Sequence, residues 1–222
     1  KHLLKINNSQ ALRTASQALE TDIQQTLAER GVAPQLLYQH PDSLYTISEY
    51  LDGYHPSKQK ALSRTELNSI ISTVGRIHTS NTEHINLPQI NYAKTLLDYS
   101  KQASNHLTNN SSANKLLTEV QKQATLYQNR YGDQRCLVHH DLVAENMILL
   151  NSANQMQCRF IDWEFSCLGI ASFDYAAIAI ELNVALLSVS ELSGIDQEEL
   201  SLAAKVYKHL CHFYRKATAT SQ

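Results

Sequence analysis

Short apolar stretches separated by polar turns dominate the N-terminal part of this chain, whereas longer amphipathic segments dominate the remainder. The short stretches predict β-strands at residues 2–6, 36–38 and 44–51. The last two strands are joined by the turn sequence His-Pro-Asp-Ser. Asp52-Gly53 follows as another turn, and we predict that a hinge there divides the chain into two parts, residues 1–52 and 53–222.

A helix is predicted between the first two strands. Its leucine and isoleucine residues recur on one face over about residues 10–30, and Gly31 stands where a helix-ending glycine is expected. The polar residues at 7–9 are suited to cap its start. Glu20 lies beside the apolar face, so its carboxylate is expected to point inward at the edge of the core.

The second part of the chain follows the helical period. Amphipathic helices are predicted at residues 65–79, 92–107, 114–131, 173–185 and 198–217. Two short apolar strands, at 147–150 and 158–161, flank a polar turn and predict a β-hairpin within the segment 136–164. The polar stretch at 108–114 is expected to be a flexible loop. Together these elements indicate an α+β protein.

Composition restricts the class of protein. The chain has 222 residues, of which 43% are hydrophobic and 18% charged, as in globular proteins. A formal charge of −2 provides no basic footprint for nucleic acid or an anionic membrane surface, and no apolar run has transmembrane length. The four cysteines show no paired spacing, so we expect free thiols in a reducing, cytoplasmic compartment.

Oxygen-bearing side chains gather at the open ends of the predicted hairpin. A His-His-Asp motif that ends in Asp141 precedes it, and Asn146 follows five residues later. Asp162 comes directly after the hairpin, with Glu164 two positions on. Phosphoryl transfer needs a carboxylate to orient the attacking hydroxyl and hard oxygen ligands to hold Mg²⁺ at the nucleotide phosphates. The spacing H-x-D-x-x-x-x-N followed by D supplies both and is shared by protein kinases and small-molecule kinases.

A second candidate cluster combines the first strand with the first helix. Lys5 lies inside the predicted strand 2–6, and Glu20 can face it. Kinases hold nucleotide phosphates with such a pair, because the carboxylate fixes an ammonium group that contacts the phosphate oxygens. The extended backbone before the predicted hinge, around Glu49 and Leu51, can offer N–H and C=O groups to an adenine edge.

These motifs resemble the aminoglycoside phosphotransferase and choline kinase superfamily, the small-molecule branch of the protein-kinase-like fold. The segment L-V-H-H-D-L-V-A-E-N resembles its catalytic loop, and F-I-D-W-E-F resembles the metal-binding segment of choline, ethanolamine and thiamine kinases. The stretches I-S-E-Y-L-D-G, G-R-I-H and G-I-A-S-F-D-Y-A-A are similar to further elements of the family. The resemblance implies a two-lobe α+β fold with a small β-rich N-terminal lobe and a larger, mainly helical C-terminal lobe.

The resemblance also implies a role for each candidate residue. The catalytic base would be Asp141. The oxygen ligands of Mg²⁺ would be Asn146, Asp162 and Glu164. The groups that bind ATP would be Lys5, Glu20 and, through the backbone, Glu49 and Leu51. Support of the site would come from His139, which would brace the catalytic loop, and Asp174, which would tie helix to loop.

Three departures from the family pattern affect the interpretation. Val143 stands where protein serine/threonine kinases commonly carry lysine, and no D-F-G or A-P-E motif follows, which disfavours a protein kinase. His140 replaces a common small residue. No glycine-rich phosphate loop precedes Lys5, so we expect a truncated N-terminal lobe, either because the sequence begins part-way into a longer chain or because the protein lacks the loop.

The sequence therefore predicts an ATP- and Mg²⁺-dependent kinase for the hydroxyl of a small, cationic alcohol of the choline, ethanolamine or thiamine type. An aminoglycoside phosphotransferase is the alternative within the same class, since acidic residues of the last third could line a pocket for a polycation. A catalytically idle, kinase-like binding module is the alternative from another class. The missing phosphate loop favours that module, whereas the intact Asp141, Asn146 and Asp162 oppose it. No nucleic-acid or membrane partner is expected.

Overall fold

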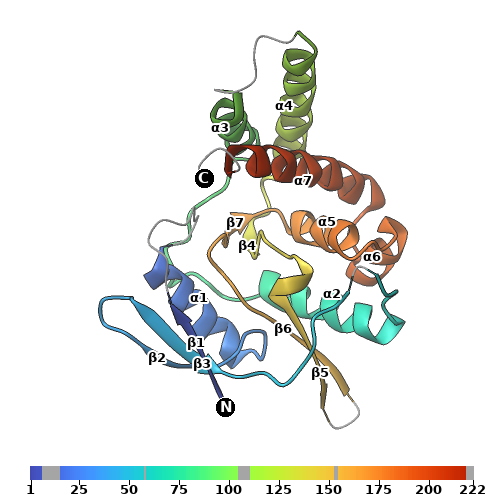
Figure 1. Ribbon diagram of the computed structural model, residues 1–222. Helices are drawn as coiled ribbons and strands as arrows, with labels where there is room; N and C mark the ends of the chain where they lie inside the picture. The colour runs from blue at the N-terminus through green and yellow to red at the C-terminus, as the bar shows by residue number, and fades with distance from the viewer. Residues whose placement is uncertain (7–15, 58, 105–110, 153–154, 219–222) are drawn as a thin grey trace.

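The computed structural model describes residues 1–6, 16–57, 59–104, 111–152 and 155–218 (Figure 1). Its N-terminal part is a three-stranded antiparallel sheet in the order β1–β3–β2. The strands are β1 (His2–Ile6), β2 (Leu36–Gln39) and β3 (Tyr45–Glu49). All three predicted strands are confirmed, and β3 is shorter than the apolar stretch that predicted it. Lys5 lies opposite Thr46 within the pairing of β1 and β3.

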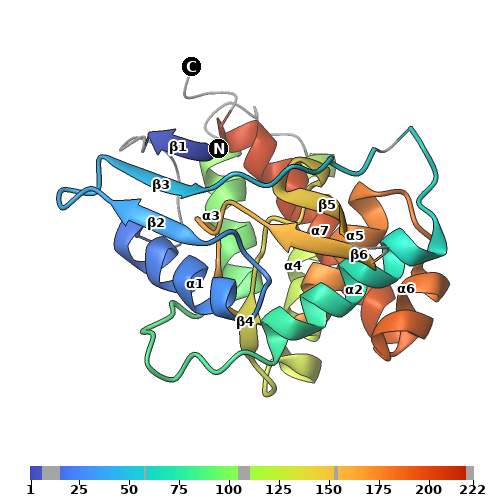
Figure 2. The same cartoon turned by 90° about the horizontal axis from the view of Figure 1, so that it is seen from below.

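Helix α1 (Gln17–Glu29) lies along one face of this sheet (Figure 2). It begins after Ser16, whose side chain accepts a backbone hydrogen bond from the first turn at 3.2 Å. The predicted start of this helix near residue 10 is wrong, because Ser16 is extended and α1 begins at Gln17. Residues 7–9, which were predicted to cap it, lie outside the described residues. At the other end Gly31 has a φ of 63°, as predicted for a helix-ending glycine. Glu20 is buried on the inner side, as expected.

The larger part of the molecule is mainly helical. Its helices are α2 (Arg64–His78), α3 (Tyr92–Ser104), α4 (Ser111–Tyr131), α5 (Ala171–Glu181), α6 (Leu186–Ser193) and α7 (Gln197–Thr218). In Figure 1, α7 crosses between the α3–α4 pair and α5, and it packs on all three. In the part of the chain that the structure describes, no helix combines the length and the apolar character needed to span a membrane.

Two helix predictions need correction. Residues 111–113, predicted as loop, belong to the first turn of α4, because two serines and an alanine carry no large apolar side chain that would register in the hydrophobic period. The helix predicted at 173–185 ends at Glu181, where the left-handed Asn183 (φ 52°) breaks it, and α6 follows as a separate helix. Asparagine enters this backbone region readily, and an apolar pattern does not reveal such a break.

Two small sheets hold the candidate loops side by side. Strands β4 (Cys136–Val138) and β7 (Cys167–Gly169) pair antiparallel, and so do β5 (Met147–Ser152) and β6 (Gln155–Phe160). The β5–β6 hairpin is confirmed and is longer than predicted, whereas β4 and β7 were too short to be predicted from the sequence. The loop from β4 to β5 and the loop from β6 to β7 therefore meet at one end of these sheets.

Gly53 and Tyr54 connect the two parts of the molecule. Tyr54 pairs with Leu149 of β5 through two backbone hydrogen bonds of 3.0 and 2.8 Å. A Cβ atom at Gly53 would lie 2.5 Å from the Leu149 carbonyl oxygen, so only glycine permits this approach. The segment after the predicted hinge is thus attached to the hairpin that carries the candidate site. The division of the chain at residue 52 stays a prediction.

Candidate active site

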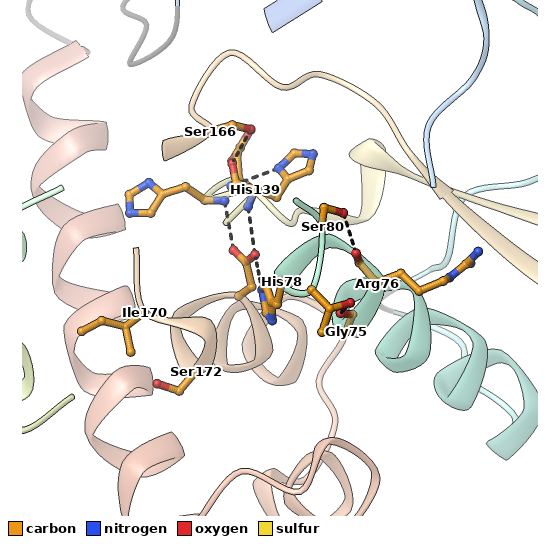
Figure 3. Close-up of polar contacts among 12 residues, drawn as sticks. Gly75, Arg76, His78, Ser80, His139, Ser166, Ile170 and Ser172 are labelled. Atoms are coloured by element: carbon orange, nitrogen blue, oxygen red, sulfur yellow. Dashed lines mark hydrogen bonds and ion pairs between the residues drawn. The ribbon is translucent and has the colours of Figure 1, made fainter. Parts of the chain in front are cut away.

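One buried carboxylate fixes the backbone of the loop after β4. Asp174, in the first turn of α5, accepts hydrogen bonds from the amides of His139 at 2.9 Å and His140 at 3.0 Å. His78 approaches the same carboxylate, with its Nε2 atom 3.0 Å away (Figure 3). Burial raises the pKa of Asp174, but the hydrogen bond and charge of His78 help to lower it, and the net shift is downward. The contact between helix and loop that was predicted for Asp174 is present.

His78 also belongs to this network, although no sequence motif assigned it to the site. It is the last residue of α2, and its side chain is largely buried. The only signal for it was its position at the end of a predicted helix, in the G-R-I-H stretch. A helix end alone does not show which carboxylate the side chain will meet.

His139 connects the two loops of the site. Its Nδ1 atom accepts a hydrogen bond from the Asp141 amide at 3.3 Å, and its Nε2 atom lies 3.0 Å from the carbonyl oxygen of Ile161. An amide requires an acceptor and a carbonyl requires a donor, so the ring is neutral and carries its proton on Nε2. Ser166 also donates to the His139 carbonyl at 3.5 Å (Figure 3). His139 therefore braces the loop and has no nitrogen left for chemistry.

Asp141 and Asn146 form the centre of the first loop. The Asn146 amide nitrogen donates to the backbone carbonyl and to the Oδ2 atom of Asp141, in both cases at 2.9 Å. Burial is the largest influence on Asp141 and raises its pKa, as does the nearby Asp162, against the lowering effect of the Asn146 hydrogen bond. A carboxylate with a raised pKa is better suited to accept a proton near neutral pH.

Lys5 joins the N-terminal sheet to the second loop. Its Nζ atom lies 2.5 Å from Glu20 Oε1 and 2.8 Å from Asp162 Oδ1. Burial lowers the pKa of Lys5, but the two carboxylates raise it more, and the net shift is upward. The side chains of Lys5 and Asp162 are 36% and 37% exposed, so the contact is open to solvent. The strand–helix ion pair expected from the sequence is present, and it extends to the candidate metal ligand.

The donor atoms of this cluster fit Mg²⁺ in chemical type. Asn146 uses its amide nitrogen in the bonds to Asp141, and these bonds leave its side-chain oxygen unused. Together with the Asp162 carboxylate it supplies hard oxygen donors, of which Mg²⁺ usually takes one or two from protein and the rest from phosphate and water. Among the described residues no group of three or more His, Cys, Asp or Glu side chains is arranged to hold a metal alone.

The backbone around Glu49 and Leu51 has partners of its own. The Glu49 amide donates to the Gln35 carbonyl at 2.8 Å, and the Leu51 carbonyl accepts from the Gly53 amide at 3.1 Å. An adenine edge would have to form hydrogen bonds with the remaining backbone N–H and C=O groups of this segment. The assignment of Glu49 and Leu51 to adenine binding stays a prediction.

A small aromatic cavity of about 80 Å³ opens beside Asp141. Besides the ring of His140, its rings come from α3, α5, α7 and the loop before β7, and they are Tyr99, Phe165, Phe173, Tyr207 and Tyr214. The Tyr207 hydroxyl donates to Glu181 Oε1 at 3.1 Å. Burial, then the charges of Glu164 and Asp141, raise the pKa of Tyr214. The sequence does not predict this cavity, because the chain carries eleven tyrosines without a spacing that selects Tyr99, Tyr207 and Tyr214.

The sequence profile of the choline/ethanolamine kinase family matches residues 1–220, nearly the whole chain. The chain belongs to this family. It is therefore an ATP-dependent phosphotransferase that uses an alcohol as acceptor. The superfamily that the motifs predicted is confirmed. A search of curated proteins finds no match.

Solved structures show the same kinase-like fold. Choline kinase LicA from Streptococcus pneumoniae gives a TM-score of 0.75 at 15% identity, covering 99% of this chain and 78% of LicA. LicA is also known in complex with AMP. A choline/ethanolamine kinase family protein from Mesorhizobium loti gives 0.69 at 18% identity, covering 100% and 74%. The aminoglycoside phosphotransferase APH(3'')-Id from Streptomyces rimosus, in complex with ADP and streptomycin, gives 0.69 at 16% identity, covering 96% and 86%. Likeness at these identities establishes the two-lobe α+β fold and does not select the acceptor.

Proposed function

We propose that the protein transfers the γ-phosphate of ATP to the hydroxyl of a small, cationic alcohol of the choline, ethanolamine or thiamine type. One observation carries this proposal: an aromatic cavity lies directly against Asp141. Asp162, which bonds Lys5 at 2.8 Å, also raises the pKa of Asp141 through its charge, so the cluster of Lys5, Glu20 and Asp162 acts on the same carboxylate. The two substrates would thus meet at one carboxylate.

Asp141 is the proposed base. An alcohol in the cavity would present its hydroxyl to the carboxylate, which Asn146 holds at Oδ2. As the hydroxyl oxygen bonds to the γ-phosphorus, its proton passes to Asp141 and the bond from that phosphorus to the ADP oxygen breaks. Positioning and charge stabilisation account for most of the catalysis in such transfers. The upward shift in the pKa of Asp141 favours proton acceptance.

Residues from both parts of the molecule would neutralise the negative charge of the triphosphate. Lys5, fixed by Glu20, is the proposed cation for the phosphate oxygens. Asn146 and Asp162, with Glu164 nearby, are the proposed ligands of Mg²⁺. When bound, this ion neutralises negative charge on the β- and γ-phosphates.

The cavity favours a small cation. Faces of aromatic rings attract cations, and Glu181, which Tyr207 holds, adds negative charge that also acts on Asp141. The volume of the cavity is about 80 Å³. That size matches a small amino alcohol better than a multi-ring aminoglycoside.

An ATP-consumption screen tests the proposal. Choline, ethanolamine, thiamine, homoserine, methylthioribose and aminoglycosides are offered with Mg-ATP, and phosphorylated product is measured by mass. We expect ADP and product in equal amounts with a small cationic alcohol. Turnover with aminoglycosides alone would support the alternative phosphotransferase. Stabilisation by Mg-ATP without turnover of any acceptor would support the idle binding module.

A further inference from the structure

His140 has a backbone conformation that few residue types adopt. Its φ is 69°, in the left-handed region, which asparagine, aspartate and histidine enter more readily than other residues with a side chain. Its amide donates to Asp174 Oδ1 at 3.0 Å, and this hydrogen bond helps to hold the backbone in that conformation. The direction of the His140 side chain is therefore set by the same carboxylate that fixes the catalytic loop.

The imidazole ring of His140 forms part of the wall of the acceptor cavity. It stacks on Phe173 with ring centroids 4.4 Å apart and planes 8° apart, and both rings line the cavity. Asp141, the next residue, lines it as well. A residue without a ring at position 140 would leave this volume to the acceptor, close to the proposed base.

Packing alone does not account for a histidine at this place. The Nε2 atom of His140 is buried and has no hydrogen-bond partner within the described part of the chain. Buried polar atoms nearly always have a partner, so an apolar ring would stack on Phe173 with less penalty. The left-handed backbone by itself would favour asparagine or glycine, which have no ring. Histidine combines a flat ring with tolerance of that backbone.

The charge state of the ring agrees with a wall for a cationic acceptor. Burial lowers the pKa of His140 to about 4, so the imidazole is neutral near pH 7. A neutral ring does not repel a cation, and its face adds to the aromatic lining of the cavity.

We propose that His140 is a specificity-determining residue, whose ring fills the cavity beside Asp141 and restricts phosphoryl transfer to small alcohols. The inference rests on the proposed function and adds the residue that limits acceptor size. With the ring in place, the cavity that it helps to line has a volume of about 80 Å³.

Two substitutions separate the ring from the backbone requirement. His140→Asn keeps a residue that accepts the left-handed backbone and removes the ring, whereas His140→Phe keeps a ring and removes the nitrogen atoms. The measurement is the ratio of kcat/KM for a bulky acceptor, kanamycin, to kcat/KM for ethanolamine. We expect the ratio to rise by about tenfold or more in His140→Asn and to stay near the wild-type value in His140→Phe. The KM for ATP should change by less than about twofold.

A ratio in His140→Asn within about twofold of wild type overturns the inference, and so does an equal rise in His140→Phe. His84→Asn, the same change at an exposed histidine, is the matched control and should leave the ratio unchanged. Binding of each acceptor is measured in parallel as a shift of the melting temperature in Mg-ADP, which needs no turnover. Absence of turnover with every amino alcohol overturns the proposed function. Equal relative binding of bulky and small cations by wild type and His140→Asn overturns the role of His140.

Discussion

The side-chain nitrogen of Asn146 lies 2.9 Å from both the carbonyl oxygen and the Oδ2 atom of Asp141. The short 3₁₀ helix at Ala144–Asn146 returns the chain so that two residues five positions apart meet. The proposed base and a proposed metal ligand are thus one hydrogen-bonded unit. A change in either residue is expected to alter the orientation of the other.

Asp141→Asn removes the proton acceptor and retains the shape of the side chain. We expect kcat to fall by about 10²- to 10⁴-fold, because general base catalysis typically contributes that much. The KM for ATP and the melting temperature should stay close to wild type. A coupled assay of ADP release measures the rate. Glu145→Gln, at an exposed neighbour, is the control and should keep the wild-type rate; retained turnover in Asp141→Asn would contradict the assignment of the base.

Lys5→Met removes the ammonium group that bonds Glu20 and Asp162. We expect weaker Mg-ATP binding, and a double-mutant cycle with Glu20→Gln should show coupling of about 0.5–2 kcal/mol, because residues in contact rarely act additively. Calorimetric titration with Mg-ATP measures the four affinities. Strictly additive losses of affinity would show that Glu20 does not act through Lys5.

Asp174→Ala leaves the amides of His139 and His140 without their buried acceptor. Loss of one partner from a buried charged pair is expected to lower the free energy of unfolding by about 3–5 kcal/mol at neutral pH. Urea denaturation measures it, and Asp133→Ala, at an exposed residue, should change it by less than about 0.5 kcal/mol.

The destabilisation in Asp174→Ala should depend on pH in a stated direction. The pKa of Asp174 is lowered in the folded state, so its contribution is present above the aspartate pKa of the unfolded chain, about 3.9. The contribution is lost as the pH falls through the folded-state value. The stabilities of wild type and Asp174→Ala should therefore converge in acid; a constant difference down to complete acid unfolding would contradict the lowered pKa.

His140 should make stability depend on pH in a different range. Its folded-state pKa of about 4 lies below the value of about 6.5 for an unperturbed histidine, so the unfolded chain binds more protons between these values. The free energy of unfolding should fall as the pH decreases from about 6.5 to about 4, by up to about 3 kcal/mol from this residue. His140→Asn should flatten the profile in that range. Parallel profiles for the two proteins would show that His140 is not buried as a neutral ring.

Gly53→Ala tests the attachment of the hinge to β5. The added Cβ atom would lie 2.5 Å from the Leu149 carbonyl oxygen, so the backbone must move apart. We expect a loss of about 1–3 kcal/mol in the free energy of unfolding and weaker Mg-ATP binding, since the segment joins the two parts of the molecule. Gly75→Ala, inside α2, is the control: its Cβ atom would meet only Tyr175 at 3.4 Å, and alanine favours a helix by about 0.5–1 kcal/mol. Equal effects of the two changes would exclude a special role for the Gly53 approach.

The elements that carry the candidate site residues were predictable because each depends on local structure. The apolar strand around Lys5 and the helix that carries Glu20 follow from hydrophobic periodicity, and Asp141, Asn146 and Asp162 from motif spacing around a hairpin. The structure then brings Lys5 to 2.8 Å from Asp162, across 157 positions of the chain. The α6 helix and the strands β4 and β7 were missed for the opposite reason, since a left-handed Asn183 and strands of three residues leave no periodic pattern.

The sequence by itself determined the kinase-like family, most helices and strands, and the loops that carry the oxygen-bearing side chains, because periods and motifs are properties of neighbouring residues. Only the tertiary structure determined which residues line the acceptor cavity and which groups surround His140. Tyr99, Phe165 and Tyr214 stand on segments far apart in the chain, and they meet because α3, α7 and the loop before β7 pack together. The spacing of neighbouring residues does not predict contacts between such distant segments, because these contacts depend on how whole helices pack.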